Sequence, residues 1–295
     1  MVKKSLAVLG TVLLLHGIAH AADANSNASA GADGVAPGQV DPGRGTWAVQ
    51  AQLGLIMTSG DTSTKSGNGS FGVAHRMGRW TLSGGLGALY ASTGHITTQQ
   101  DTNARLRADM ALSPRTFWFS TARWDRNLFS GFRYQESIAS GGGFKFIKTP
   151  ATLLAAELGV GYRREQPEIL VTLPDTSVHA RGLDPVVNDA VLQAGVNYSH
   201  SITHLTKVVN ALVVQYGSSD TTTTDNLSLQ VKVDASLSLA VGMQLVNNTN
   251  PPPGAVRHTD TVMTVNLIYT HKNPKLSGTD TTPQFVSNIN MLDLP

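Results

Sequence analysis

The stretch ATLLAAELGVGYRR, residues 151–164, alternates apolar and polar side chains along its length. One set of alternate positions holds apolar residues, namely Leu154, Ala156, Leu158, Val160 and Tyr162. The other set holds small or charged residues, namely Glu157, Gly159, Gly161 and Arg163. Because successive side chains of a strand point to opposite faces, this period of two predicts a β-strand whose charges share one face.

The same alternation recurs from Trp47 to His271. For example, Arg105, Arg107 and Asp109 alternate with apolar neighbours. Twelve strands are predicted, at about 46–58, 64–75, 79–92, 100–112, 116–126, 133–147, 151–164, 187–200, 204–217, 221–235, 236–248 and 259–271. The ninth segment is apolar on both faces, so its register stays open. The pattern predicts one all-β domain at 46–272, an antiparallel up-and-down barrel.

The connections between these segments alternate in length. The short ones are 76–78, 113–115, 148–150, 201–203 and 235–236. The long ones are 59–63, 93–99, 127–132, 165–186, 218–220 and 249–258. Outer-membrane barrels have short periplasmic turns and longer external loops, so this order predicts a transmembrane barrel with both chain ends on the periplasmic side.

The first 21 residues have the form of a signal peptide. Lys3 and Lys4 precede an apolar run from Ser5 to Leu15, and Ala19-His20-Ala21 resembles a signal-peptidase site. A membrane anchor is the alternative, but the run is shorter than the ~20 apolar residues that a spanning helix needs. We therefore expect export and cleavage, a flexible Pro- and Gly-rich lead at 22–45, and a tail at 273–295.

Composition excludes several classes of protein. No other apolar run approaches spanning length, so the mature chain is either soluble or crosses a membrane as a closed barrel. The chain has 22 basic and 20 acidic residues, and removal of Lys3 and Lys4 leaves 20 of each, which does not favour nucleic-acid binding. Without cysteine there is no disulfide, thiolate metal site or lipidated N-terminal cysteine.

Aromatic residues lie near predicted strand ends, with the apolar parity of their strands. One set is expected at the periplasmic interface, namely Trp47, Trp80, Trp118, Tyr198 and Tyr269. The other is expected at the external interface, namely Tyr90, Trp124, Tyr134, Tyr162 and Tyr216. Two such girdles favour a membrane barrel. The competing hypothesis is a soluble periplasmic barrel or sandwich binding protein, whose apolar faces would point inward.

Charged residues of the opposite parity are candidates to face the lumen. They are Arg105, Arg107, Asp109, Arg123, Asp125, Arg133, Lys145, Glu157, Arg163, Lys232 and Asp234. These residues would line a narrow pore with a basic wall, or they would pair and fill the interior. Small barrels are often filled by their own side chains, so the second interpretation is favoured.

Histidines raise the alternative of an outer-membrane hydrolase or a metal site. His258 and Asp260 share one predicted external loop, and His200 and His204 flank a predicted turn, but neither pair has a matching nucleophile. His75, His95, His179 and His271 are isolated, without metal-ligand spacing. We therefore predict no catalytic residues, metal or cofactor.

Several short segments between 46 and 271 resemble the domain-of-unknown-function 481 family of salt-induced outer-membrane proteins. The segments that carry this resemblance are Gly60-Asp61-Thr62, Arg79-Trp80, Leu89-Tyr90, residues 129–135 (FSGFRYQ), residues 159–163 (GVGYR), residues 250–254 (NPPPG) and Thr259-Asp260-Thr261. The resemblance implies an outer-membrane barrel. It also implies that the assembly machinery reads an aromatic residue of the last strand, here Tyr269, although 24 residues follow His271.

The predicted function is a non-enzymatic outer-membrane barrel, with either a structural stress-response role or a narrow passive channel. The expected partners are outer-membrane lipid and, during biogenesis, the barrel-assembly machinery. No nucleic acid is expected, and nothing in the sequence indicates the oligomeric state.

Overall fold

The computed structural model describes residues 46–58, 64–93, 96–127, 131–172, 179–251 and 258–272. Within these ranges the strands are β1 (Thr46–Thr58), β2 (Thr64–Met77), β3 (Trp80–Thr93), β4 (Ile96–Ala111), β5 (Thr116–Asn127), β6 (Phe132–Lys148), β7 (Thr152–Thr172), β8 (His179–Leu183), β9 (Val187–Ser201), β10 (Thr206–Tyr216), β11 (Thr221–Lys232), β12 (Leu237–Asn248) and β13 (Thr259–Lys272). The described ranges contain no helix long and apolar enough to cross a membrane. The predicted signal peptide, lead and tail lie outside them.

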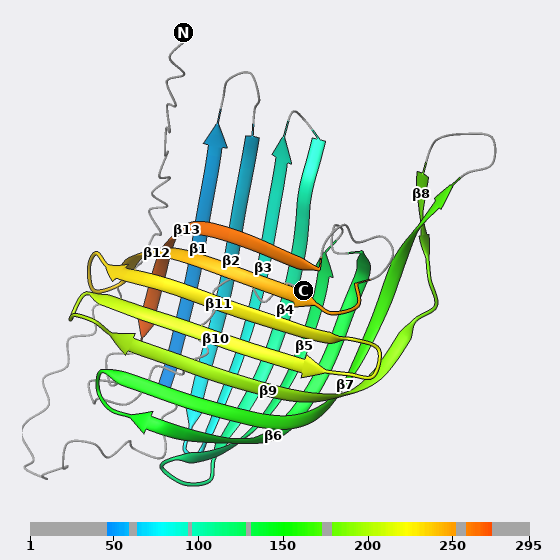
Figure 1. Ribbon diagram of the computed structural model, residues 1–295. Coiled ribbons are helices and arrows are strands. Elements are labelled where there is room, and N and C mark those ends of the chain that lie inside the picture. Colours follow the sequence, from blue (N-terminus) through cyan, green and yellow to red (C-terminus); the bar gives the residue numbers. More distant parts are fainter. Residues whose placement is uncertain are drawn as a thin grey trace, which may run out of the picture.

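The strands form one antiparallel sheet that closes on itself (Figure 1). Each barrel strand pairs with its neighbours in the chain, β7 pairs with β9, and β1 pairs with β13. All strands except β8 therefore make up a twelve-stranded up-and-down barrel. The fold class predicted from the alternation is confirmed.

The predicted loop at 165–186 is partly a hairpin. β7 continues to Thr172, and its last residues pair with β8 from Glu168–Leu183 to Thr172–His179. This hairpin extends beyond the barrel (Figure 1). Sequence alternation missed it because the four consecutive residues 165–168 are all buried, which interrupts the period of two at the point where β7 leaves the barrel.

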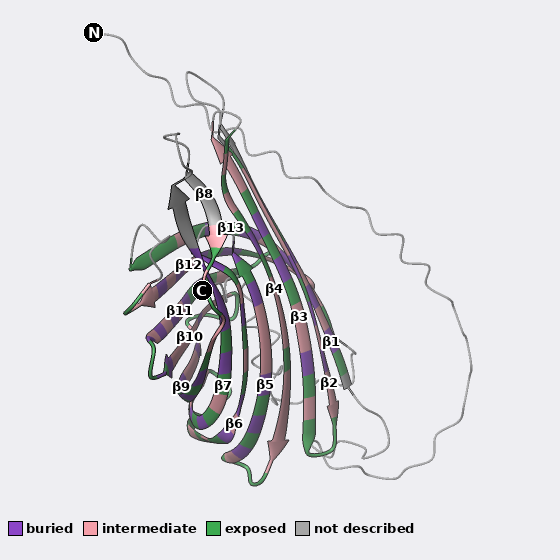
Figure 2. Cartoon of the chain, turned by 90° about the vertical axis from the view of Figure 1, so that its right-hand side faces the viewer, coloured by how far each residue is buried: buried purple, intermediate pink, exposed green. Residues whose placement is uncertain are grey.

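Burial alternates along the strands (Figure 2), and many large apolar residues are exposed. On β7, Val160 is 71% exposed whereas Arg163 is 2% exposed. This order is the reverse of a soluble barrel, and it agrees with an outer surface that contacts hydrocarbon. The uncertain register of β10 is also resolved, because Val209 is buried and Tyr216 is exposed.

Four of the five short turns share one construction. In each of these four, a side-chain oxygen accepts a hydrogen bond from the backbone N–H three residues later, at Ser113, Thr149, Thr203 and Asp234. The backbone N–H of the same residue donates to the carbonyl of the residue three later. Such side-chain bonds satisfy turn N–H groups locally. The remaining short turn uses Gly78, whose φ of 55° suits glycine.

Candidate functional site: the barrel interior

An ion-pair network crosses the interior between β4 and β7. The Arg107 Nη2 atom lies 2.8 Å from Asp109 Oδ1 and 2.7 Å from Glu157 Oε2. Nη1 of the same guanidinium lies 3.1 Å from Glu157 Oε1, so that contact is bidentate. Because β5 and β6 separate the two strands in the sheet, the Arg107–Glu157 pair bridges the concave side of the barrel wall.

Aromatic rings fill the interior beside this network. Phe119 is fully buried, and the Arg107 guanidinium lies 4.9 Å from its ring centroid. The Lys145 ammonium lies 5.9 Å from the ring centroid of Phe117. A Cβ atom at Gly143 would overlap the Phe117 ring, so the absence of a side chain there makes room for the ring.

A second network lies toward the long-loop end of the barrel. Arg163 Nε is 3.1 Å from Glu165 Oε1, and Arg163 Nη1 donates to Thr222 Oγ1 at 3.0 Å. Its Nη2 pairs with Asp220 in the connection between β10 and β11. Burial raises the pKa of the Asp220 carboxyl, and the charge of Arg163 opposes that shift. These contacts join β7 to β11 across the two strands between them.

A small cavity lies beside the second network, with Arg163 and Thr222 in its lining. It measures about 20 Å³, enough for one water molecule. Its lining includes Arg123, whose Nε lies 2.5 Å from Asp125 Oδ2, as well as Gln135 and Gln215. Within the described residues, Gln135 also donates to Glu165 at 2.6 Å. Charged and amide groups thus line this cavity.

The facing wall is built from amides and hydroxyls. Its buried residues are Gln50, Gln52, Ser70, Asn226, Ser228, Gln244, Thr264 and Asn266. Asn68 Nδ2 donates to Asn266 Oδ1 at 2.8 Å, which links β2 to β13 across β1. Both amides pass over Gly54, where a Cβ atom would collide with them.

Most of the predicted interior residues lie in this region. Those that are buried or half-buried on the polar face are Arg105, Arg107, Asp109, Arg123, Asp125, Lys145, Glu157 and Arg163. The structure brings Arg107, Asp109 and Glu157 into one network. It places Arg163 in the other network, with residues outside the predicted set.

Three predicted interior residues lie elsewhere. Arg133 is exposed, because a bulge between Phe132 and Tyr134 removes it from the alternation of β6. Lys232 is exposed as the last residue of β11. Asp234 lies in the following turn, where backbone N–H groups bind its carboxylate and lower its pKa. For Arg133 and Asp234, the alternation was extended to positions outside regular strand pairing.

Sequence reasoning also missed five buried acidic residues, Asp101, Glu165, Glu168, Asp189 and Asp220. Asp101 and Asp189 have the polar parity of their strands, so alternation would have identified them. Glu165, Glu168 and Asp220 lie in segments predicted as loops, where parity gives no information.

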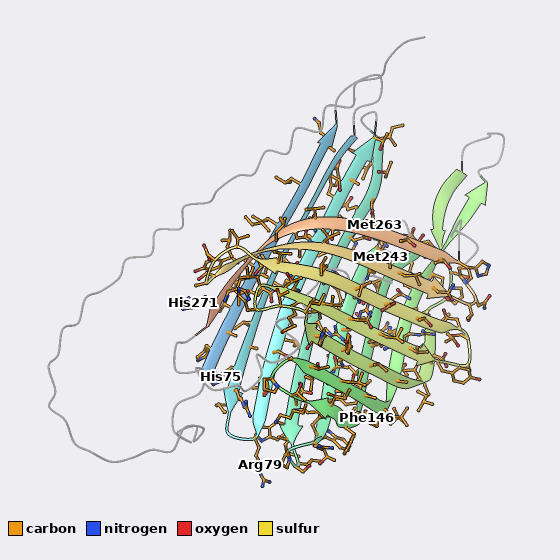
Figure 3. The ribbon with its side chains drawn as sticks, turned by 60° about the vertical axis from the view of Figure 1, so that its left-hand side comes forward. His75, Arg79, Phe146, Met243, Met263 and His271 are labelled. Atoms are coloured by element: carbon orange, nitrogen blue, oxygen red, sulfur yellow. The ribbon has the colours of Figure 1, made fainter. Side chains whose placement is uncertain are left out.

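The ten predicted interface aromatics lie on the outer face, exposed or half-buried. The Trp47 ring stacks on His75 at 4.0 Å, and the Tyr162 hydroxyl donates to Asn188 Oδ1 at 2.8 Å. His75 lies toward the short-turn end of the barrel with Phe146 (Figure 3). Near the strand ends, aromatic rings therefore lie beside polar groups on the outer face.

The histidines that raised the hydrolase alternative have ordinary structural contacts. His258 Nδ1 lies 3.2 Å from the carbonyl of Asn248, and His200 Nδ1 lies 2.8 Å from Thr152 Oγ1. In the part of the chain that the structure describes, no three histidine, aspartate or glutamate side chains are grouped to hold a metal ion.

Comparison with known proteins identifies the family. The family model "Protein of unknown function, DUF481" matches residues 51–271. The uncharacterised protein YdiY of Escherichia coli K12 is 24% identical over 190 residues, which cover 64% of this chain and 69% of YdiY.

Two solved structures are similar to this chain, at low identity and with TM-scores below 0.5. The autotransporter NalP translocator domain of Neisseria meningitidis has 10% identity and a TM-score of 0.47, covering 77% of this chain and 87% of that domain. An outer membrane channel of Pseudomonas putida F1 has 12% identity and a TM-score of 0.44, covering 81% of this chain and all of that one. The family resemblance inferred from the sequence motifs is confirmed by the family model: this chain belongs to the DUF481 family.

Proposed function

We propose that this protein is a non-enzymatic barrel of the outer membrane whose lumen is closed by its own side chains, with a structural role in the envelope. The observation that carries the proposal is the buried Arg107–Glu157 pair, which bridges β4 and β7 inside the barrel. The facing wall supports it, because Gln52 and Gln244 are each 1% exposed. A wide solute path would leave such residues accessible.

The outer face supports the placement in a membrane. Leu106 and Val160, at mid-strand, are 66% and 71% exposed, and aromatic rings lie nearer the strand ends. Along its paired ladders the barrel satisfies its backbone hydrogen bonds internally, as a hydrocarbon environment requires. Outer-membrane lipid is therefore the proposed partner of this face, and the barrel-assembly machinery is its proposed partner during biogenesis.

A narrow channel is the second candidate. Buried hydroxyl oxygens of Ser70 and Ser228, both on the amide wall, have no hydrogen-bond partner among the described residues. Buried polar groups of this kind are usually hydrated, which favours a thin file of water along the amide wall. Such a file would pass small ions only.

Two measurements test the proposal. Folded barrel extracted in detergent should migrate anomalously on a gel until it is boiled, and recovery in a detergent-free periplasmic extract would contradict the membrane placement. Wild-type protein in planar bilayers should then show no stable conductance steps, whereas Arg107→Ala should show them. Arg115→Ala, in an exposed turn, is the matched control.

Conductance in the wild type would instead establish the channel. Its steps should then change when Arg105, Arg107 and Arg123 are neutralised together. Hydrolysis of lipid or peptide substrates that disappears in His258→Ala would contradict the non-enzymatic assignment.

A further inference from the structure

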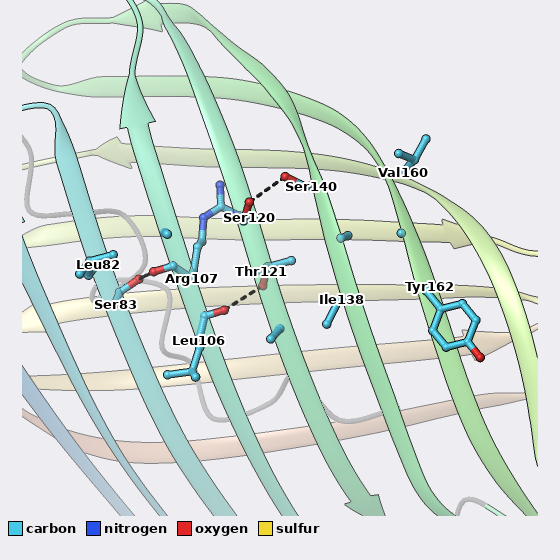
Figure 4. Close-up of a pocket in the computed structure, with 14 residues that line it drawn as sticks. Leu82, Ser83, Leu106, Arg107, Ser120, Thr121, Ile138, Ser140, Val160 and Tyr162 are labelled. Atoms are coloured by element: carbon cyan, nitrogen blue, oxygen red, sulfur yellow. Dashed lines mark hydrogen bonds between the residues drawn. The ribbon is translucent and has the colours of Figure 1, made fainter.

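Two adjoining apolar grooves cross the outer face of β3–β7, with volumes of about 780 and 760 Å³. Small residues form the floor of the first groove, namely Ala108, Ser120, Ala122 and Ser140. Leu106, Ile138 and Tyr162 line both grooves. Figure 4 shows them in the first groove. The volumes are in the range of small-molecule sites.

The hydroxyl groups in the floor do not make it polar. The oxygen atoms of Ser120 and Ser140 lie 2.7 Å apart (Figure 4). The Ser140 hydroxyl also donates to the carbonyl of Phe119 at 2.9 Å. Both hydroxyls are thus satisfied within the protein. A surface with its polar atoms paired internally suits hydrocarbon chains better than water.

Positive charge lies directly beyond the second groove, toward the long-loop end. Trp124, Glu136 and Arg164 are in register on β5, β6 and β7 and line that groove. Arg126 and Arg133 lie farther along the same strands and are exposed. β5 and β7 are two strand spacings apart, so the arginines span about 10 Å across the sheet.

The three arginines of this cluster, Arg126, Arg133 and Arg164, are available for a ligand. Their guanidinium groups form no ion pair or hydrogen bond with another described residue. Trp124 and Tyr162, beside them, have the amphipathic rings that favour a membrane interface. The cluster therefore lies where lipid headgroups meet acyl chains.

We propose that this face binds a phosphorylated glycolipid of the outer leaflet, of the lipid A type. Its acyl chains occupy the two grooves and its phosphate groups bind the arginine cluster. Guanidinium groups bind phosphate through paired charge-assisted hydrogen bonds, and basic clusters beside apolar surfaces recognise anionic lipids. The inference rests on the membrane placement proposed above, but not on whether the lumen is closed.

Native mass spectrometry of the full barrel in dodecyl maltoside, with diphosphoryl lipid A or phosphatidylethanolamine added, tests the headgroup contact. We expect wild-type protein to retain one lipid A molecule at least tenfold more tightly than phosphatidylethanolamine. The double variant Arg126→Gln/Arg164→Gln should lose about tenfold or more of that affinity. Lys65→Gln, an exposed cation on β2, is the matched control and should bind like the wild type.

Two further variants separate the acyl and headgroup contributions. Ala122→Phe should weaken lipid A binding by filling the grooves, whereas Ala194→Phe, an exposed outward position on β9, should not. Glu136→Gln should strengthen binding, because it removes the negative charge within the arginine row.

Specific outcomes would overturn the inference. Equal affinity for both lipids, or equal affinity of the double arginine variant and Lys65→Gln, would mean an ordinary lipid annulus. Heat-modifiable migration shows whether each variant is folded. If the wild type itself lacked that migration, the membrane placement would fail first, which distinguishes the two failures.

Discussion

At the scale of single residues, the interior depends on charges that satisfy each other. Arg107 is held by two carboxylates, and the Glu157 side chain is 2% exposed. Removal of one partner from a buried pair leaves an uncompensated charge, which costs more than loss of the pair as a whole. Residue-level tests therefore need single and double variants.

Arg107→Met should lower the free energy of unfolding by about 3–5 kcal/mol, because Asp109 and Glu157 lose their buried partner. Arg107→Met/Glu157→Met should be less destabilised than the sum of the two single changes. Urea unfolding of the barrel in micelles measures both. Simple additivity of the two substitutions would contradict the pairing.

Gly143→Ala should destabilise the barrel by about 1–3 kcal/mol, because its Cβ atom would overlap the Phe117 ring. Gly142→Ala is the matched control, since its Cβ atom would meet nothing closer than 4.0 Å. Phe117→Leu should rescue part of the loss in the Gly143→Ala background. The same unfolding assay compares the variants, and equal stability of the two alanine variants would exclude this packing role.

At the scale of elements, the short turns define where strands end. Each of the four similar turns begins with a Ser, Thr or Asp whose side chain binds the backbone N–H three residues later. The spacing is visible in the sequence as Ser113–Thr116 and Asp234–Leu237. It explains why Asp234, predicted to face the lumen, belongs to a turn.

Ser113→Ala and Thr203→Ala should each lower the free energy of unfolding by about 0.5–1.5 kcal/mol, the net contribution of one or two hydrogen bonds. Ile202→Ala is the matched control, because Ile202 is exposed and lies beside Thr203 in the same turn. Ser218→Ala would not serve, because the Ser218 hydroxyl donates a hydrogen bond to Asp189. An effect of Ile202→Ala as large as that of Thr203→Ala would argue against the turn bond.

Asp234 should add a pH dependence to the stability. Two backbone N–H groups lower the pKa of its carboxyl from the ordinary 3.8, so the folded state prefers the charged form. That stability is present above pH 3.8 and is lost as the pH falls through the lowered pKa. Unfolding measured from pH 6 downward should therefore show a smaller acid-dependent loss in Asp234→Ala, and identical profiles would refute the effect.

At the scale of the whole molecule, the barrel closes through its β1–β13 pairing. That ladder runs only from Ala48–Lys272 to Leu53–Leu267, whereas the β1–β2 ladder covers all of β1. β1 and β13 diverge toward the long-loop end (Figure 1). The side-chain bond between Asn68 and Asn266 lies at the point where the ladder ends.

A disulfide can be introduced between β1 and β13 without competing thiols, because the chain contains no cysteine. Leu53→Cys/Leu267→Cys places two thiols at directly opposed outward positions, within the reach of a disulfide. Oxidation should raise the temperature at which the gel migration changes, and reduction should reverse the increase. Each single cysteine variant is the control, and a lack of cross-linking would contradict the register.

The alternation by itself determined the number of barrel strands, the outward face of each except β10, and most of their bounds to within about two residues, because a period of two is a local property of an extended chain. It could not determine that Arg107 meets Glu157 or that Arg163 meets Asp220, fifty or more residues apart. Those contacts exist only when the sheet curves and closes. It also misplaced Arg133, because a bulge in β6 breaks the period of two there. It predicted a loop where β7 pairs with β8, because a run of buried residues breaks the period at that point.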